Sequence, residues 1–343
     1  MRATTLREAR LITIKDVARH AGVSMSTVSY VLSGKRPISP ATSHRVRRSI
    51  RELGFHPHAG ARALASSRTR VLALVVPLRT DLDLPVIMQF VTSILTTARA
   101  HDHDVLLLTK ESGADEVHRV IASSRADAVL VMDVEADDPR LPSLRALEVP
   151  VVLVGVPADA SGLSCVDLDF TASGARMVAH LADLGHRSIG MVGSPPAVYE
   201  RGTGYASRFL AGVTDCARRR GVEVHVHPCA PTQSALSECL YDLLRPDRAI
   251  TGLIVHNEAV LGGLVQELRR RGRRVPEDLS VIALCPDTTA AAQQVPLTSI
   301  AVPAAEVGVI AVETLMRGLA GERSHGVRLL APHLTERGST AVR

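Results

Sequence analysis

Residues 13–64 read TIKDVARHAGVSMSTVSYVLSGKRPISPATSHRVRRSIRELGFHPHAGARAL, and this stretch decides how the chain begins to fold. Its first half carries the signals of two short helices joined by a tight turn. Thr13 can cap a helix whose apolar side chains follow at i, i+3, i+4 and i+7 spacing, namely Ile14, Val17, Ala18 and Ala21. Gly22 can adopt the left-handed conformation that ends this helix. Ser24 can cap the next helix, whose inward-facing residues would be Val28, Val31 and Leu32.

A helix, a turn containing glycine and a second helix make a helix-turn-helix pattern. In that motif the N-terminal residues of the second helix enter the major groove of DNA. Here these residues have short or amphipathic side chains: Met25, Ser26, Thr27, Ser29 and Tyr30. Ser39 and Pro40 predict the start of a third helix, whose buried stripe would be Val46, Ile50 and Leu53.

This stretch resembles the N-terminal domain of the bacterial repressor family named after the lactose and purine repressors. Five short motifs occur in order at the family spacing: Thr13–Ala18, Ala21–Ser24, Thr27–Ser29, Leu53–Pro57 and Ala61–Leu64. The resemblance implies that Met25, Ser26 and Tyr30 read base edges. It also implies a hinge helix around residues 59–67, whose Leu64 would wedge into the minor groove and kink the DNA. We expect contacts to the DNA backbone from Thr13, Thr27, Ser29, Arg45 and Arg62.

The distribution of charge supports a DNA partner independently. Residues 1–69 contain 13 Lys and Arg against three acids (Glu8, Asp16 and Glu52), which gives a net charge of +10. The whole chain contains 40 against 35, so the remainder has 27 against 32, a net charge of −5. Such asymmetry predicts a polyanionic partner for the N-terminal part alone. Binding should weaken steeply with salt if phosphates are neutralised by Lys35, Arg45, Arg47, Arg48, Arg51 and Arg62. Any single arginine of the third helix could equally well lie on a solvated helix face instead of contacting a phosphate.

Composition sets the outer bounds. A chain of 343 residues exceeds one ordinary domain, and 46 % hydrophobic content suffices for several cores. No apolar run approaches the roughly 20 residues of a membrane span. Residues 1–11 are not followed by the apolar stretch of a signal peptide, so we expect a flexible arm and a cytoplasmic protein without a membrane partner. Five cysteines without CxxC spacing predict reduced thiols rather than disulfides or metal ligands.

From residue 70 onward, continuous Val- and Leu-rich runs alternate with helical segments, as in parallel sheets covered on both faces. The predicted fold class is therefore an all-α helix-turn-helix head followed by an α/β body of two doubly wound parallel-sheet lobes. The expected domains are a flexible arm (1–11), a helix-turn-helix domain (12–58), a hinge (59–69) and an effector-binding and dimerisation body (70–343).

The resemblance extends over the body through Leu184–Arg187, Val275–Ile282 and Pro296–Ile300. The family body is similar to periplasmic sugar-binding proteins, with two lobes, three crossovers and an effector in the cleft between them. It implies crossovers near Cys165–Asp169, near Asp287–Gln294 and after Gly321. The N-lobe would then comprise about 70–166 plus 288–320, and the C-lobe about 167–287 plus 321–343.

The resemblance also suggests effector-binding residues. Arg208 and Asn257 match family positions, with Arg201 as the competitor of Arg208. The Asp expected directly after the strand at 281–284 is Cys285 here, so the nearest acid, Asp287, is the effector-binding candidate in its place.

Aromatic residues make up only 2 % of the chain, and Trp is absent. Sugar sites typically combine an apolar wall with a few polar groups. Tyr199 and Tyr205, in a glycine-rich loop beside Arg201, are the preferred pocket aromatics. Phe90, Phe170 and Phe209 fall on predicted helices and are expected to pack in the core.

These observations favour a DNA-binding transcriptional regulator, a repressor that binds a palindromic operator as a homodimer and responds to a sugar-like effector. The alternative is a ligand-independent DNA binder whose body only dimerises. An enzyme is not expected, because the sequence has neither a GxxxxGK[ST] phosphate loop nor a GxSxG motif. No cofactor is expected, and His101–Asp104 reads as a solvated loop rather than a metal site. The C-terminus has no leucine heptads, which favours a dimer over a coiled-coil tetramer.

Overall fold

The computed structural model describes residues 12–33, 36–55, 68–79, 81–109, 113–322 and 325–343. The chain divides into two compact units. The first, which we call the head, contains the described residues up to Arg70 together with Ser123–Asp127. The second, the body, contains Val71–Ala122 and Ala128–Arg343.

The head consists of three helices, α1 (Ile14–Ala21), α2 (Met25–Ser33) and α3 (Pro40–Leu53). Their ends follow the predicted capping, since Ser39 accepts a hydrogen bond from the Thr42 amide and Gly22 takes a φ of 65°. The core contains Val17, Ala18, Ala21, Val28, Val46 and Phe55.

The predicted inward orientation of Leu32 is wrong, because this side chain is 38 % exposed. Phe55, which follows α3, supplies the large apolar side chain of the core instead, at 6 % exposure.

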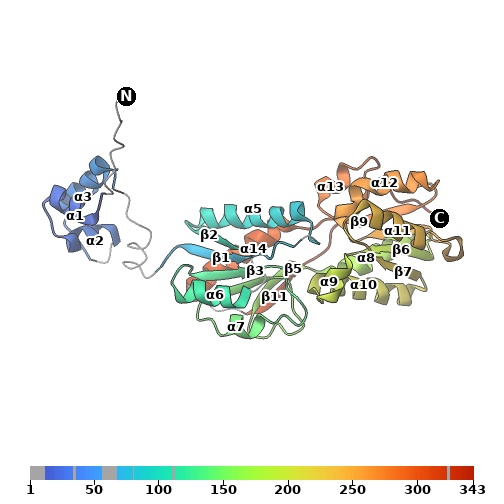
Figure 1. Ribbon diagram of the computed structural model, residues 1–343, viewed down its shortest axis with the longest axis horizontal. Coiled ribbons are helices and arrows are strands. Elements are labelled where there is room, and N and C mark those ends of the chain that lie inside the picture. The colour runs from blue at the N-terminus through green and yellow to red at the C-terminus, as the bar shows by residue number, and fades with distance from the viewer. Residues whose placement is uncertain (1–11, 34–35, 56–67, 80, 110–112, 323–324) are drawn as a thin grey trace, which may run out of the picture. The chain divides into compact units, whose positions relative to one another are not determined.

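The body contains two six-stranded sheets, each at the centre of one lobe (Figure 1). In the first lobe the strand order is β11-β5-β4-β3-β1-β2, and every pairing is parallel. These strands are β1 (Val71–Val75), β2 (Asp104–Leu108), β3 (Ala128–Val131), β4 (Val151–Val154), β5 (Ser164–Leu168) and β11 (Gly326–Leu330). The helices of this lobe are α5 (Leu84–Ala100), α6 (Gly113–Ala122), α7 (Leu141–Arg145) and α14 (Ala304–Leu319).

In the second lobe the order is β12-β10-β9-β8-β6-β7, parallel except for β12, which runs antiparallel to β10. The strands are β6 (Ser188–Gly193), β7 (Glu223–Pro228), β8 (Gly252–Val255), β9 (Ser280–Leu284), β10 (Thr298–Ile300) and β12 (Leu334–Thr335). The α-helices are α8 (Phe170–Asp183), α9 (Pro196–Glu200), α10 (Gly204–Arg220), α11 (Gln233–Leu243), α12 (Leu261–Arg270) and α13 (Asp287–Ala291), and two 3-10 helices are η1 (Pro246–Arg248) and η2 (Glu258–Val260).

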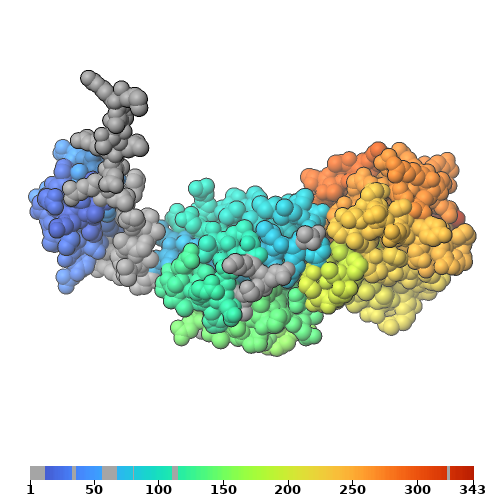
Figure 2. Space-filling view, in the orientation of Figure 1, coloured from blue at the N-terminus to red at the C-terminus, as the bar shows by residue number. Residues whose placement is uncertain are grey.

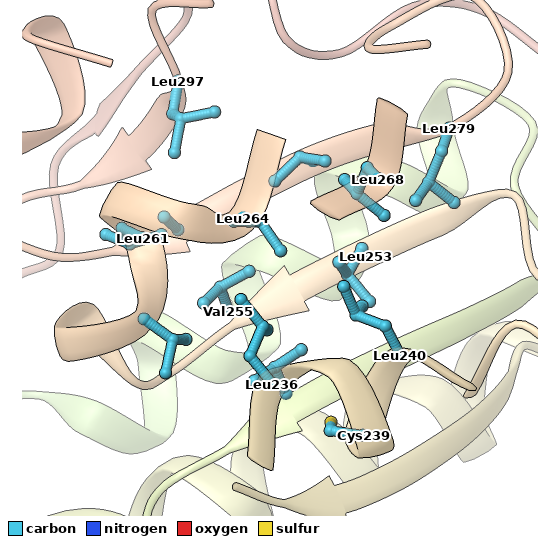
Figure 3. Close-up of a cluster of buried hydrophobic side chains, with 14 of the residues drawn as sticks. Leu236, Cys239, Leu240, Leu253, Val255, Leu261, Leu264, Leu268, Leu279 and Leu297 are labelled. Carbon is cyan, nitrogen blue, oxygen red and sulfur yellow. The ribbon is translucent and has the colours of Figure 1, made fainter. Parts of the chain in front are cut away.

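The inner strands of both sheets are buried because helices cover them, as the continuous apolar runs predict, whereas the edge strands β2, β7 and β11 are partly exposed. Figure 3 shows part of the second-lobe core, where leucines of α11 and α12 meet β8 around Leu253 and Val255. In the space-filling view the first lobe is mainly cyan and green and the second mainly yellow to orange, so each lobe uses largely its own half of the body sequence (Figure 2). The predicted fold class of two parallel-sheet lobes behind a helix-turn-helix head is confirmed.

Two of the predicted lobe boundaries are wrong. Residues 287–294 stay in the second lobe, because α13 is followed by β10 in that lobe's sheet and Ala290 and Leu297 belong to its core. The chain returns to the first lobe only after β10, where α14 begins. The predicted placement of all of residues 321–343 in the second lobe also fails, because β11 pairs with β5 of the first-lobe sheet. The last crossover therefore lies between β11 and β12.

A close helix crossing fixes the second-lobe wall of the cleft. A Cβ on Gly212 of α10 would lie only 2.0 Å from the carbonyl oxygen of Thr171 on α8. Only glycine permits this approach. It holds the start of α10, with Tyr205 and Arg208, against Phe170 at the start of α8.

Among the described residues, no helix has the length and apolar character that a membrane span requires.

Candidate nucleic-acid interface and cleft

The first turns of α2 present the predicted base-reading residues on one side of the helix. Met25 is 53 % exposed, Ser26 is exposed and Tyr30 is partly buried. Val28, on the opposite side, is fully buried and sets the rotation of the helix. Ser29 completes an i, i+1, i+4, i+5 set that faces away from the core. This is the surface that a helix-turn-helix motif offers to a groove.

Two of the predicted backbone-contacting hydroxyls are already engaged within the head. The Ser24 hydroxyl accepts a hydrogen bond from the Thr27 amide at 3.1 Å, and the two hydroxyl oxygens lie 2.8 Å apart. Thr13 donates both its amide and its hydroxyl to the Asp16 carboxylate, at 3.0 and 2.7 Å. Both residues therefore hold the starts of helices, whatever they contact on DNA.

Arg36 is a residue that the sequence reasoning did not single out as a base-reading neighbour. Its guanidinium carbon lies 5.5 Å from the centroid of the Tyr30 ring, a distance at which a cation and an aromatic face attract. The two residues are six positions apart across the end of α2, and no helical spacing predicts this contact. Arg36 thus restrains the orientation of Tyr30.

The exposed arginines of α3 differ in whether an ion pair within the head already engages them. Arg45 and Arg47 are exposed, and no ion pair of either is found in the described structure. Arg48 donates to the Glu52 carboxylate at 2.7 Å, and this hydrogen bond lowers the pKa of Glu52. The positive charge of Arg48 is therefore already paired with Glu52 within the head. The predicted contacts of Lys35, Arg62 and Leu64 lie outside the described residues.

A cavity of about 110 Å³ lies in the body between the two lobes. Met132, Gly155, Asp167, His256 and Leu284 line it at or just beyond the carboxyl ends of β3, β4, β5, β8 and β9. Ligands of open α/β sheets bind at such ends. The cavity is smaller than the roughly 300–1,000 Å³ typical of ligand pockets, so it suits a small ligand or lobes that open to admit a larger one.

The aromatic wall of the cavity corrects the expectation for Tyr199 and includes two rings that were expected only in the core. Tyr205 lines the cavity as predicted, but Tyr199 does not, because its hydroxyl accepts a hydrogen bond from the Ser194 amide at 3.3 Å. Phe90 and Phe170, expected in the core, line the cavity as well. Both rings also pack in the cores of their lobes, Phe170 at 8 % exposure, so they belong to core and cavity wall at once. Phe209 is fully buried, as expected of a core residue.

Two ion pairs connect the lobes beside the cavity. Arg208 of α10 pairs with Asp167 of β5, and its guanidinium carbon lies 5.5 Å from the Phe170 ring centroid. Burial raises the pKa of Asp167 to about 6 although Arg208 opposes the shift. Arg201 pairs with Asp81 at 2.5 Å. The predicted competitors Arg208 and Arg201 therefore both contact the other lobe and flank the cavity.

Several buried polar atoms near the cavity have no partner within the described structure: Nε and Nη2 of Arg201, Oδ1 of Asp133 and Oγ1 of Thr203. The other carboxylate oxygen of Asp133 pairs with Arg79, and burial raises the pKa of Asp133. A buried donor or acceptor left unpaired costs about 1–3 kcal/mol. Of these residues Asp133 lines the cavity, so its Oδ1 is an acceptor available to a polar ligand.

Asn257 and Asp287 do not line the cavity, in contrast to their predicted role. The Asn257 amide donates to the Cys229 carbonyl at 2.6 Å, and the Asp287 carboxylate pairs with Arg337 at 2.5 Å. Both side chains are committed to the protein. His256 and Glu258, which flank Asn257, line the cavity in its place.

The sequence reasoning missed Asp133, His256 and Glu258. Each lies within three residues of the end of a buried strand, β3 or β8, and this placement was the available signal. Burial lowers the pKa of His256 to about 3 and raises that of Glu258 to about 7, so His256 is neutral at pH 7. Cys285, where the family pattern has Asp, is fully buried, and burial raises the pKa of its thiol to about 12.

Comparison with known proteins adds to this geometry. Residues 13–58 match the model of bacterial regulatory proteins of the lacI family, and residues 178–340 match a periplasmic binding protein-like domain. The chain is 32 % identical over 348 residues to the HTH-type transcriptional regulator CelR of Thermobifida fusca, covering 97 % of this chain and 100 % of the relative. These matches confirm the resemblance seen in the sequence.

Solved structures agree. A complex of the transcriptional regulator CelR with cellobiose superposes with a TM-score of 0.66 at 28 % identity, covering 96 % of this chain and 99 % of the other. A lac repressor dimer bound to operator and the anti-inducer ONPF shares the fold, with a TM-score of 0.84 at 22 % identity and coverage of 97 % and 100 %. The curated relatives are regulators rather than enzymes. Head, two-lobed body and relatives together establish that this chain belongs to the lacI family of bacterial, DNA-binding transcriptional regulators.

Proposed function

We propose that this regulator is a repressor that binds a palindromic operator as a homodimer and reads it with Met25, Ser26 and Tyr30. The observation that carries the proposal is the exposed, capped start of α2 in a segment of net charge +10. A two-fold symmetric protein selects a two-fold symmetric site. A structural relative has been seen as a dimer on its operator.

The DNA backbone would be contacted by Thr13, Thr27, Ser29, Arg45 and Arg62. Family membership supports Leu64 as the side chain that enters the minor groove at the centre of the operator. A side chain that wedges between base pairs costs free energy because it unstacks them. The additional contacts that bent DNA permits offset this cost.

We further propose that the cleft binds a small polyhydroxylated effector, a sugar or sugar derivative. Asp133, which lines the cavity, has an unpaired carboxylate oxygen that a ligand hydroxyl group can satisfy, and the charge of Arg201 acts on Asp133. Phe90, Phe170 and Tyr205 supply an apolar wall for a ring face. The CelR relative forms a complex with cellobiose, a disaccharide.

Effector binding would act through the contacts between the lobes. Gly204 donates its amide to the Val134 carbonyl at 3.0 Å, and Ala136 donates to the Gly202 carbonyl at 2.8 Å. These backbone bonds hold the loop that carries Arg201 on the first lobe. A ligand that favours this arrangement shifts the population toward it by its differential affinity.

The test is selection of DNA sites in vitro with the purified protein, repeated with a pool of sugars and other metabolites. An enriched palindrome that a metabolite strengthens or abolishes supports the whole proposal. A palindrome that no metabolite affects supports the second candidate, a ligand-independent regulator, which the buried Cys285 at the place of the family Asp favours. Enrichment of no site contradicts the DNA-reading part.

A further inference from the structure

The acids of the cleft divide into two kinds. Asp167 and Asp133 each have an arginine partner, Arg208 and Arg79 respectively. Glu258 and Asp83 also line the cavity, yet within the described residues neither forms an ion pair. Asp83 accepts a hydrogen bond from the Val86 amide at 3.0 Å as the cap of α5, so the helix N-terminus stabilises its charge but no cation pairs with it among the described residues.

Glu258 and Asp83 approach the cavity from opposite lobes. Glu258 begins η2 directly after β8, whereas Asp83 precedes α5 of the first lobe. Burial is the main cause that raises the pKa of Glu258, and the charge of Asp83 adds to it, whereas a hydrogen bond from the Glu258 amide opposes the shift. A buried carboxylate beside a like charge is unfavourable unless a cation or a proton joins it.

Aromatic rings also line the cavity. The Phe170 and Tyr205 rings lie 5.5 Å apart, and the Tyr205 and His256 rings meet edge to face at 5.8 Å. Since His256 is neutral, it contributes an aromatic surface rather than a positive charge. Aromatic faces attract ammonium groups within about 6 Å of the ring centroid. Carboxylates without an ion pair and aromatic rings thus line the same cavity, and such a lining is complementary to a cationic group.

We propose that the effector carries a positively charged amine, which binds between Glu258 and Asp83 and against the rings of Phe170 and Tyr205. An ammonium group has three donors and no acceptor, so it can serve both carboxylates at once. Together with the unpaired carboxylate oxygen of Asp133, the site then selects a polyhydroxylated amine, of which amino sugars are the natural class. This inference rests on the proposed effector site and specifies its ligand.

The test uses matched ligands that differ only in an amine, added to the full chain: glucose against glucosamine, and cellobiose against the β-1,4-linked glucosamine dimer. Calorimetry at pH 7 should show the amine member of at least one pair binding ten-fold or more tightly than its neutral partner. Glu258→Gln should abolish this preference, and Asp83→Asn should reduce it. Glu277→Gln, an exposed glutamate of the second lobe, is the matched control and should retain the full preference.

Each other outcome is informative. If the neutral member binds as well as the amine, or if Glu258→Gln keeps the preference, the cationic group is overturned while the polyol effector stands. If no member of either pair binds, the cationic proposal and the sugar-like effector both fail. The melting temperature of each variant without ligand verifies that it is folded.

Discussion

The head and the cleft assemble their functional residues in opposite ways. The head places Met25, Ser26 and Tyr30 on consecutive turns of one short helix, whereas the residues that line the cavity range from Leu82 to Val302. A single helix fixes relative positions by its own geometry. A cleft between two lobes depends on strand order and crossovers, which are long-range properties. The contrast explains why one site could be located in the sequence and the other only in part.

The two sites also use charge differently. The arginines of α3 lie at the surface, where solvent and salt screen them. The charged groups of the cleft are buried enough that pKa values shift, as for Asp167 and Glu258. We therefore expect substitutions in the head to alter salt dependence and base preference, and substitutions in the cleft to alter pH dependence and ligand choice.

The largest effect should come from the head core. Phe55→Ala removes a side chain that is 6 % exposed, at a cost of about 3–5 kcal/mol. This loss is comparable to the total free energy of unfolding of a domain as small as the head, because native domains are stable by only roughly 0.05–0.15 kcal/mol per residue. Operator binding should be lost, while calorimetry should still show the unfolding transition of the body and its ligand response.

Leu32→Ala is the matched control in the same unit, because Leu32 is 38 % exposed and should change stability by only about 0.5 kcal/mol. Near-normal operator binding by Phe55→Ala would show that the head core does not depend on Phe55. Loss of the body transition would show that head and body do not fold independently.

The head could be predicted closely because its signals are local. Thr13, Gly22, Ser24 and Ser39 mark helix ends, and apolar spacing marks the buried faces. The misplacement of Leu32 and the contact between Arg36 and Tyr30 both depend on where the chain goes after α2 and α3. Periodicity within one helix carries no information about such contacts.

The second-largest effect concerns pH. The pKa of Glu258 rises from 4.5 to about 7 on folding, so the folded state holds this proton more tightly than the unfolded state. Stability therefore falls as pH rises from about 4.5 to about 7. Glu258→Gln removes this loss, so its stability relative to the natural chain should increase over that window, on the order of 1–3 kcal/mol.

Urea denaturation of both chains without ligand, at pH 4.5 and pH 7.5, measures this difference. Asp167 has a raised pKa in both chains, so its contribution cancels. If the difference in unfolding free energy between the two chains is the same at both pH values, Glu258 titrates normally in the folded state. The cleft would then lack the uncompensated charge that the amine proposal uses.

The cleft could be predicted only at the level of its place in the fold. Arg208 was assigned from the family pattern with Arg201 as its competitor, and Tyr205 was chosen because it lies in a glycine-rich loop beside Arg201. The prediction of Asn257 missed the lining side chains His256 and Glu258 by one residue. Neighbouring side chains at the end of β8 point to opposite sides, so Asn257 faces away from the cavity that its two neighbours line. Asp287 was assigned from the family pattern around Cys285, but α13 carries it to Arg337.

A smaller effect is expected at the base-reading surface. Tyr30→Phe removes a hydroxyl that can contact a base edge, and should change the preference at one operator position by about 1–3 kcal/mol. Arg36→Ala should weaken the preference at that same position by about 0.5–1 kcal/mol, because it frees the Tyr30 ring. Binding to operators substituted at single positions measures both. A uniform loss over all positions would instead make Tyr30 a packing or phosphate-contacting residue.

The smallest effect would separate arginines that look equivalent in sequence. Each phosphate neutralised by a cation contributes about 0.9 to the slope of log affinity against log salt. Arg45→Ala should reduce the slope by nearly that amount, whereas Arg48→Ala should reduce it less, because Arg48 hydrogen-bonds Glu52 at 2.7 Å. Glu52→Gln should release Arg48 and steepen the slope, most visibly on non-specific DNA, where phosphate contacts dominate. Equal slopes for the two alanine variants would mean that Arg48 exchanges Glu52 for phosphate at no cost, and that its ion pair in the free head does not govern DNA binding.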